Sequence, residues 1–119
     1  MSETIFSKII SGEIPSEFIY EDEYCVAIHD INPLAPVHVL VISRKPIVKL
    51  SDAGPEDAAL LGHLMLAVGT VAKQLGVDEA FRLIVNNGEG AGMTIAHLHL
   101  HILAGRTFSE GRMATGLDA

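Results

Sequence analysis

The stretch AHLHLHILAGR, residues 96–106, decides the fold, because His97, His99 and His101 alternate in it with apolar residues. Successive side chains of a β-strand point to opposite faces of a sheet. A strand over residues 95–103 therefore turns the three histidines to one face, whereas a helix would scatter them among leucines. The opposite face is expected to be apolar and to pack on a helix. It consists of Ala96, Leu98, Leu100 and Ile102.

Four further segments have the alternation or the β-branched composition of strands. They are residues 16–21, 25–30, 37–43 and 81–86. The segment 37–43, VHVLVIS, is mostly apolar on both of its faces, one of which carries His38. Apolar residues on both faces are typical of a strand that is covered on both sides. We therefore expect this strand in the centre of the sheet.

Two helices are predicted, a short one near the N-terminus and a long one in the middle of the chain. The short helix spans residues 4–12 and can end at Gly12. Its apolar face is made of Ile5, Phe6, Ile9 and Ile10. The long helix spans residues 55–76, since Pro55 suits a first turn and Gly76 suits a helix end. Strands at both ends of the chain, without βαβ alternation, predict an α+β domain with a mainly antiparallel five-stranded sheet.

The composition limits the classes of protein that fit the chain. At 119 residues there is room for a single domain, 1–119, and 49% of the residues are hydrophobic, which favours a homodimer. Its interface is expected to consist of the long helix and the neighbouring strand. The formal charge of −7 argues against a nucleic-acid polymer as partner, because such binding needs many cations. Cys25 is the only cysteine, and neither a signal sequence nor a membrane-spanning apolar run is present. A soluble cytoplasmic protein that binds no membrane is expected.

A glycine-rich loop, NNGEGAGMT at residues 86–94, precedes the histidines. Glycine allows the backbone to approach a ligand closely and to adopt positive φ, so that successive amides can converge on an anion. Asn86 and Thr94 add neutral polar groups at the two edges of this loop. A phosphate held in the loop would lie beside the histidine row.

Three interpretations of the histidine row compete. The first is a solvated strand face that happens to be rich in histidine. The second is a zinc site, although a three-ligand site needs convergent geometry and no further cluster of Cys or Glu accompanies the row. The third is nucleophilic catalysis at phosphorus, because neutral imidazole is a good nucleophile near pH 7 and neighbouring histidines can donate protons. The glycine loop beside the row favours the third interpretation.

The segment HLHLHIL, residues 97–103, resembles the defining motif of the histidine-triad (HIT) superfamily, in which three histidines alternate with apolar residues. Further stretches resemble its histidine-triad nucleotide-binding (Hint) branch and cover nearly the whole chain. They are TIFSKIISGEIPS at 4–16, YEDEYCVAIHDINPLAPVHVLVI at 20–42, LLGHLM at 60–65 and FRLIVN at 81–86. The resemblance implies a HIT-like fold and a homodimeric phosphoramidase that cleaves the P–N bond of purine nucleoside 5′-phosphoramidates, such as those of AMP, without metal or cofactor.

The resemblance also implies roles for individual residues. His99 would be the nucleophile that forms a nucleotidyl-histidine, and His97 and His101 would contact the phosphate and support proton transfer. Asp30 would hold the ribose hydroxyls. Around the phosphate the resemblance and the glycine loop place Asn86, Gly92 and Thr94. Around the nucleoside the resemblance places Phe6, Ile9, Ile28 and Ile31. The remaining histidines, His29, His38 and His63, are interpreted as structural.

Two residues depart from the branch. Many of its members carry a further active-site histidine where this chain has Pro46, and a glutamine where it has Met93. Both departures favour an alternative, a nucleotide-binding regulatory module of low turnover. A further alternative is a dinucleoside polyphosphate hydrolase or nucleotidyl transferase of the same superfamily, against which the Hint-like N-terminal half argues. The last residues, about 107–119, match no pattern of the branch and are expected to form a C-terminal tail.

Overall fold

The computed structural model describes residues 3–113, and within them five strands form one antiparallel sheet. The strands are β1 (Tyr20–Glu21), β2 (Cys25–His29), β3 (Val37–Ser43), β4 (Phe81–Ile84) and β5 (His99–Ala104). Their order is β1-β2-β3-β5-β4, and all neighbours are antiparallel. The α-helices are α1 (Ile5–Ser11) and α2 (Ala58–Gln74). The expected α+β fold is confirmed, with β3 at the centre of the sheet.

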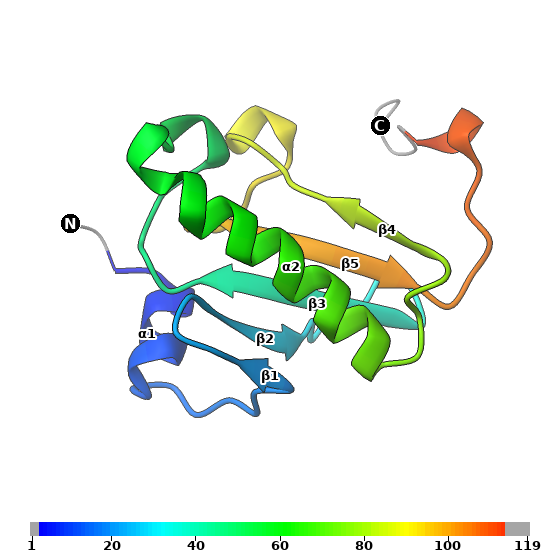
Figure 1. Ribbon diagram of the computed structural model, residues 1–119, viewed down its shortest axis with the longest axis horizontal. Coiled ribbons are helices and arrows are strands. Elements are labelled where there is room, and N and C mark those ends of the chain that lie inside the picture. Colours follow the sequence, from blue (N-terminus) through cyan, green and yellow to red (C-terminus); the bar gives the residue numbers. More distant parts are fainter. Residues whose placement is uncertain (1–2, 114–119) are drawn as a thin grey trace.

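Helix α2 crosses one face of the sheet (Figure 1), and α1 packs on the opposite face. The alternation of side chains along the central strands supplies both clusters, so each face has its own apolar core. The cluster under α2 includes Val41, Val71 and Leu100. The cluster under α1 consists of Phe6, Ile9, Val26, Ile28, Leu40 and Ile42. The even-numbered side chains of β3 therefore lie on the side of α1.

Strand β5 begins at His99, later than the predicted strand 95–103, so that His97 lies before the strand. The amide of His97 donates to the carbonyl of Ile95 at 2.9 Å, and this short-range bond bends the chain. The apolar face is present from Leu98 onward and packs under α2, but Ala96 is exposed and contributes nothing to it. The expected row of three histidines on one strand is therefore a row of two, with His97 beside it.

Other predicted elements are shorter in the structure. Residues 16–21 contribute only β1 to the sheet, and residues 81–86 contribute only β4, because the remaining residues have no ladder partner. The predicted helix 55–76 starts with the 3₁₀ turn Pro55–Asp57 and continues as α2. Ile5, expected on the buried face of the short helix, is 48% exposed.

The part of the expected tail that the structure describes, residues 107–113, folds back on β4. There Arg82 Nη2 donates to the carbonyl oxygen of Ser109 at 3.0 Å, and a 3₁₀ turn follows at Glu110–Arg112. Residues 114–119 lie outside the described part of the chain. Among residues 3–113, no helix combines the length and the apolar character that crossing a bilayer requires.

Candidate active site

The first residue of β5, His99, is held in one tautomer by the backbone. Its Nδ1 lies 2.7 Å from the carbonyl oxygen of His97. A carbonyl oxygen can only accept, so Nδ1 carries the proton and donates it. The other nitrogen of a neutral imidazole is then unprotonated. The structure therefore assigns a lone pair to His99 Nε2.

His97 directs both of its ring nitrogens at protein partners. Nε2 donates to the carbonyl oxygen of Ser43 at 2.6 Å, and Nδ1 lies 3.5 Å from the hydroxyl of Thr4. The ring of Phe6 packs edge-on against both His97 and His99, with centroids 6.1 and 4.9 Å away. The His97 side chain is buried, and the residue is 2% exposed. His97 therefore supports His99 from a buried position, and the phosphate contact that the resemblance implies for it stays a prediction.

His101 is linked to a histidine of the neighbouring strand. Its Nδ1 lies 2.9 Å from Nε2 of His38, and the amide of Leu34 donates to Nδ1 of His38 at 3.1 Å. Because Nδ1 of His38 accepts, the proton of neutral His38 is on Nε2 and is donated to His101. His101 then carries its own proton on Nε2. Its ring centroid lies 4.9 Å from that of His99, so a lone pair and an N–H belong to neighbouring rings.

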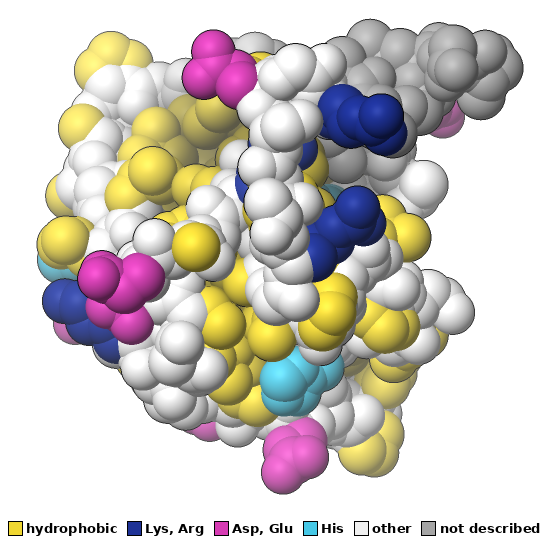
Figure 2. Space-filling model, turned by 90° about the vertical axis from the view of Figure 1, so that its right-hand side faces the viewer, with side chains coloured by type: hydrophobic (Ala, Val, Ile, Leu, Met, Phe, Trp, Pro, Cys, Tyr) yellow, Lys and Arg dark blue, Asp and Glu magenta, His cyan; other side chains and the backbone are white. Residues whose placement is uncertain are grey.

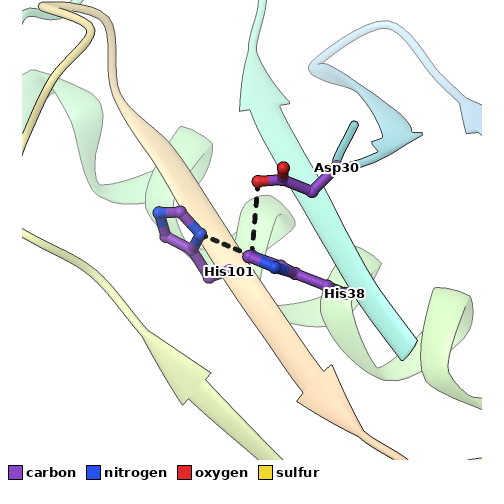
Figure 3. Close-up of side chains that lie close together, drawn as sticks. All are labelled: Asp30, His38 and His101. Carbon is purple, nitrogen blue, oxygen red and sulfur yellow. Dashed lines mark hydrogen bonds and ion pairs between the residues drawn. The ribbon is translucent and has the colours of Figure 1, made fainter. Parts of the chain in front are cut away.

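The carboxylate of Asp30 completes this group. Its Oδ2 lies 3.5 Å from Nε2 of His38, and its Oδ1 accepts from the amide of Asn32 at 2.8 Å. Figure 3 shows Asp30 and His101 both directed at the same end of the His38 ring, its Nε2. One ligand atom from each of the three residues lies within 4.8 Å of the others, so these atoms are close enough to bind one metal ion. As a hydrogen-bonded group, the same residues set the protonation of His101.

Burial favours the neutral form of the histidines on β5. It is the main cause that lowers the pKa of His99 below its ordinary value, and the positive form of His97 would add to this effect. Burial, together with His99 and His38, lowers the pKa of His101 to about 4, although Asp30 opposes the shift. Both rings are therefore neutral at pH 7, and His99 keeps its lone pair.

The glycine loop closes on itself beside the histidines. It contains the 3₁₀ turn Glu89–Ala91, flanked by Gly88 and Gly92 with φ of 93° and 95°. A Cβ added at Gly92 would lie 3.8 Å from Nδ2 of Asn86. The two ends of the loop therefore lie close together. Asn86 is half-buried and Thr94 exposed, and within residues 3–113 no hydrogen bond joins either of them to the histidines.

The expected nucleoside-binding residues divide into two groups. Phe6, Ile9 and Ile28 come together in the buried cluster under α1, next to the histidines. Ile31, by contrast, is 90% exposed on the loop after β2. Of the two departures, Pro46 is exposed and Met93 is buried.

His38 is the residue of the site that sequence reasoning interpreted only as structural. In the β3–β5 ladder Leu40 lies opposite His101 and Ile42 opposite His99, so His38 shares the face of the histidines. The alternation in residues 37–43 was the available signal, but it does not reveal which strands pair. The other two histidines are outside the site: His63 stacks on Tyr24 with centroids 3.9 Å apart, and His29 is exposed.

A five-stranded antiparallel sheet with alternating histidines at the start of its β5 strand defines a histidine-triad protein. The HIT domain matches residues 11–108. The chain is 59% identical over 107 residues to an uncharacterized HIT-like protein of Synechocystis sp., which covers 90% of this chain and 94% of that protein. The protein therefore belongs to the HIT domain family.

Solved structures show the same fold. A HIT family hydrolase from Clostridium thermocellum is 42% identical and superposes with a TM-score of 0.87, covering 92% of this chain and 96% of that one. A histidine triad nucleotide-binding protein from Candida albicans is 31% identical with a TM-score of 0.76, covering 91% of this chain and 85% of that one.

Proposed function

We propose that the protein is a hydrolase of the Hint branch that cleaves the P–N bond of purine nucleoside 5′-phosphoramidates through a nucleotidyl-His99 intermediate. The observation that carries the proposal is the hydrogen bond from His99 Nδ1 to the carbonyl of His97, which leaves Nε2 as a free nucleophile. The HIT family hydrolases among the solved neighbours support the reaction class. The nucleotide-binding neighbour from Candida albicans supports the ligand class.

The reaction follows two displacements at the α-phosphorus. His99 Nε2 attacks, the new N–P bond forms, and the amine departs with the electron pair of the old P–N bond and takes a proton from solvent. The modified ring is positively charged, and the His97 carbonyl stabilises it by accepting from Nδ1. Water then attacks phosphorus and gives up a proton to solvent, the Nε2–P bond breaks with its electron pair returning to Nε2 of His99, and the nucleoside monophosphate is released. Throughout, His101 Nε2 donates a hydrogen bond to a phosphoryl oxygen.

Neighbouring residues hold the substrate in this proposal. Asp30 accepts from the ribose hydroxyls, and Phe6, Ile9, Ile28 and Ile31 contact the base. Asn86, Gly92 and Thr94 bind the phosphoryl oxygens from the glycine loop. His97 is a positioning residue, since its ring is held by Ser43 and its carbonyl orients His99.

The covalent intermediate is the direct test. After an alkaline denaturing quench of the reaction with an adenosine phosphoramidate, under which a histidine N–P bond survives, the native protein is expected to be heavier by one AMP unit. His99→Ala should lack this species and still bind AMP, whereas His63→Ala, outside the site, should form it as the native protein does. An adduct on His99→Ala would show that another residue is the nucleophile.

A second candidate function is a nucleotide-binding module that turns over slowly. The exposed Pro46, which has no proton to transfer, favours it. In that case the adduct forms slowly and stays at low occupancy, because the departing amine lacks a proton donor. Time-resolved mass measurement of the adduct separates the two functions.

We also propose a homodimer formed through α2. Met65 and Leu66 of this helix are exposed, next to a small apolar cavity of about 110 Å³ lined by seven apolar residues. These are Leu50, Leu61, Leu64, Met65, Val85, Leu98 and Leu100. An apolar patch of this kind on a small domain is typical of a subunit interface.

A further inference from the structure

A cavity of about 380 Å³ lies between β4 and the segment that follows β5, and the proposed reaction leaves it unused. It is lined by residues of three regions: Ile84 and Arg82 from β4, Leu103 from β5, and Arg106 and Phe108 from the segment that follows. Leu34, from the loop whose backbone bonds to His38, closes another side.

The cavity continues the catalytic face of the sheet. Ile84 lies opposite His101 in the β4–β5 ladder, and Arg82 lies opposite Leu103. Residues opposite each other in a ladder share a face, and residues two apart on a strand lie roughly 7 Å apart. The cavity therefore begins one such step beyond His101. A substituent on the leaving group of a substrate bound at His99 can reach that far.

The lining of the cavity is positive in a protein whose net charge is −7. Three of the four arginines of the chain line it, namely Arg82, Arg106 and Arg112, and none of its lining residues within 3–113 is acidic. Figure 2, which faces the end of the molecule where β5 ends, shows basic side chains grouped on this surface. Such a concentration of positive charge favours an anionic ligand.

Two of these guanidinium groups are positioned by one aromatic ring. Arg82 lies over the ring of Phe108 at 4.6 Å from its centroid, and Arg106 lies at 5.8 Å. Arg82 also donates one N–H to the carbonyl of Ser109. Each guanidinium has five N–H donors in a rigid fork that matches carboxylate and phosphate oxygens. Stacking on the ring leaves most of these donors for a ligand.

We propose that this cavity is a subsite for an anionic group, a carboxylate or a phosphate, carried by the leaving amine, and that Arg82 and Arg106 recognise it. The assignment rests on the proposed phosphoramidase function and names the substrate class within it. Residues that bind the leaving group without contacting the reacting atoms change substrate preference and KM more than kcat.

The test uses adenosine 5′-phosphoramidates of three amines of similar length, long enough to extend past His101: 6-aminohexanoate, 4-aminobutyl phosphate and the neutral 6-aminohexanamide. The native protein is expected to prefer at least one anionic substrate over the amide by about tenfold in kcat/KM, mainly through KM. The comparison of the two anions distinguishes carboxylate from phosphate. Equal kcat/KM for all three substrates would overturn the subsite.

Variants assign the preference to the arginines. Arg106→Gln and Arg82→Gln should each reduce the anion-to-amide ratio several-fold, and Arg106→Lys should retain part of it because the charge remains. Lys73→Gln, which removes an exposed positive charge at the end of α2, is the matched control and should keep the native ratio. A ratio that persists in both glutamine variants would overturn the proposal.

A binding measurement separates this proposal from the proposed function. If none of the three compounds is cleaved, they serve as ligands, and their dissociation constants are measured by calorimetry. Tighter binding of an anionic compound that is lost in Arg106→Gln supports the subsite while the phosphoramidase function fails. Equal binding of all three compounds, or no binding of any, rejects the subsite.

Discussion

A carbonyl and an amide of the backbone set the protonation of the two histidines on β5. The carbonyl of His97 places the proton of His99 on Nδ1, and the amide of Leu34 places that of His101 on Nε2 by way of His38. Neither of these backbone hydrogen bonds involves a charged group. Geometry and burial therefore prepare the proposed nucleophile, His99, at neutral pH without a carboxylate beside it.

This arrangement predicts the pH dependence of hydrolysis. Because burial holds the pKa of His99 below its ordinary value of about 6.5, kcat/KM should be constant from pH 8 to 6.5 and fall only at lower pH, as His99 becomes protonated. The profile is measured with an adenosine phosphoramidate, and His99→Ala in the same buffers gives the uncatalysed rate. An acid limb centred above pH 6.5 would contradict the assignment of a buried, neutral nucleophile.

At the scale of the elements, the alternation of side chains along a strand predicts which residues share a face of the sheet. The pairing of the strands then decides which of these residues become neighbours. The five strands, the long helix and the faces of residues 37–43 and 98–103 could be predicted from periodicity alone. The role of His38 could not, because it depends on β3 pairing with β5 in the observed register. The start of β5 was missed for a related reason. The alternation continues through Ala96, but a local bond from the amide of His97 bends the chain.

The end of β5 offers a test of packing between two elements of the site. Gly105 has a φ of 88°, and a Cβ there would lie 2.8 Å from Cβ of Pro36, in the loop before β3. Gly76, after α2, has a φ of 73° with nothing within 4 Å of such a Cβ. Alanine at Gly76 should cost about 1 kcal/mol through backbone strain alone, and alanine at Gly105 about 2–4 kcal/mol because the contact with Pro36 adds overpacking.

Urea unfolding of the two variants and the native protein measures this difference. Equal losses of unfolding free energy would show that the loop containing Pro36 can move away from the added Cβ without destabilising the protein. A larger loss at Gly76 would contradict the packing of the two elements altogether.

At the scale of the whole molecule, the two faces of the sheet differ in the side chains that they and their helices present. The face under α1 carries the histidines, whereas the helix on the other face exposes apolar side chains. We expect light scattering at micromolar concentration to give twice the chain mass of 12.7 kDa. Leu66→Glu, at a residue 70% exposed on α2, should shift the protein toward monomer, because a charge in an apolar interface is desolvated without a partner.

Ile5→Glu is the matched control for the dimer. It places the same charge at another exposed apolar residue, on the helix of the opposite face, and should leave the mass unchanged. A native protein that is monomeric and fully active would refute the dimer, and so would a Leu66→Glu protein with an unchanged mass.

The hydrogen bond that Leu34 donates to Nδ1 of His38 comes from the backbone amide and not from the side chain. Every residue except proline has this amide, so the side chain at position 34 is free to vary without altering the proton on His101. Leu34 is 75% exposed, and it also lines the arginine-rich cavity. Under the proposed function, selectivity and reactivity would thus depend on different atoms of Leu34. A library that randomises position 34 to all residues but proline should therefore vary substrate choice widely while the chemical step keeps its rate.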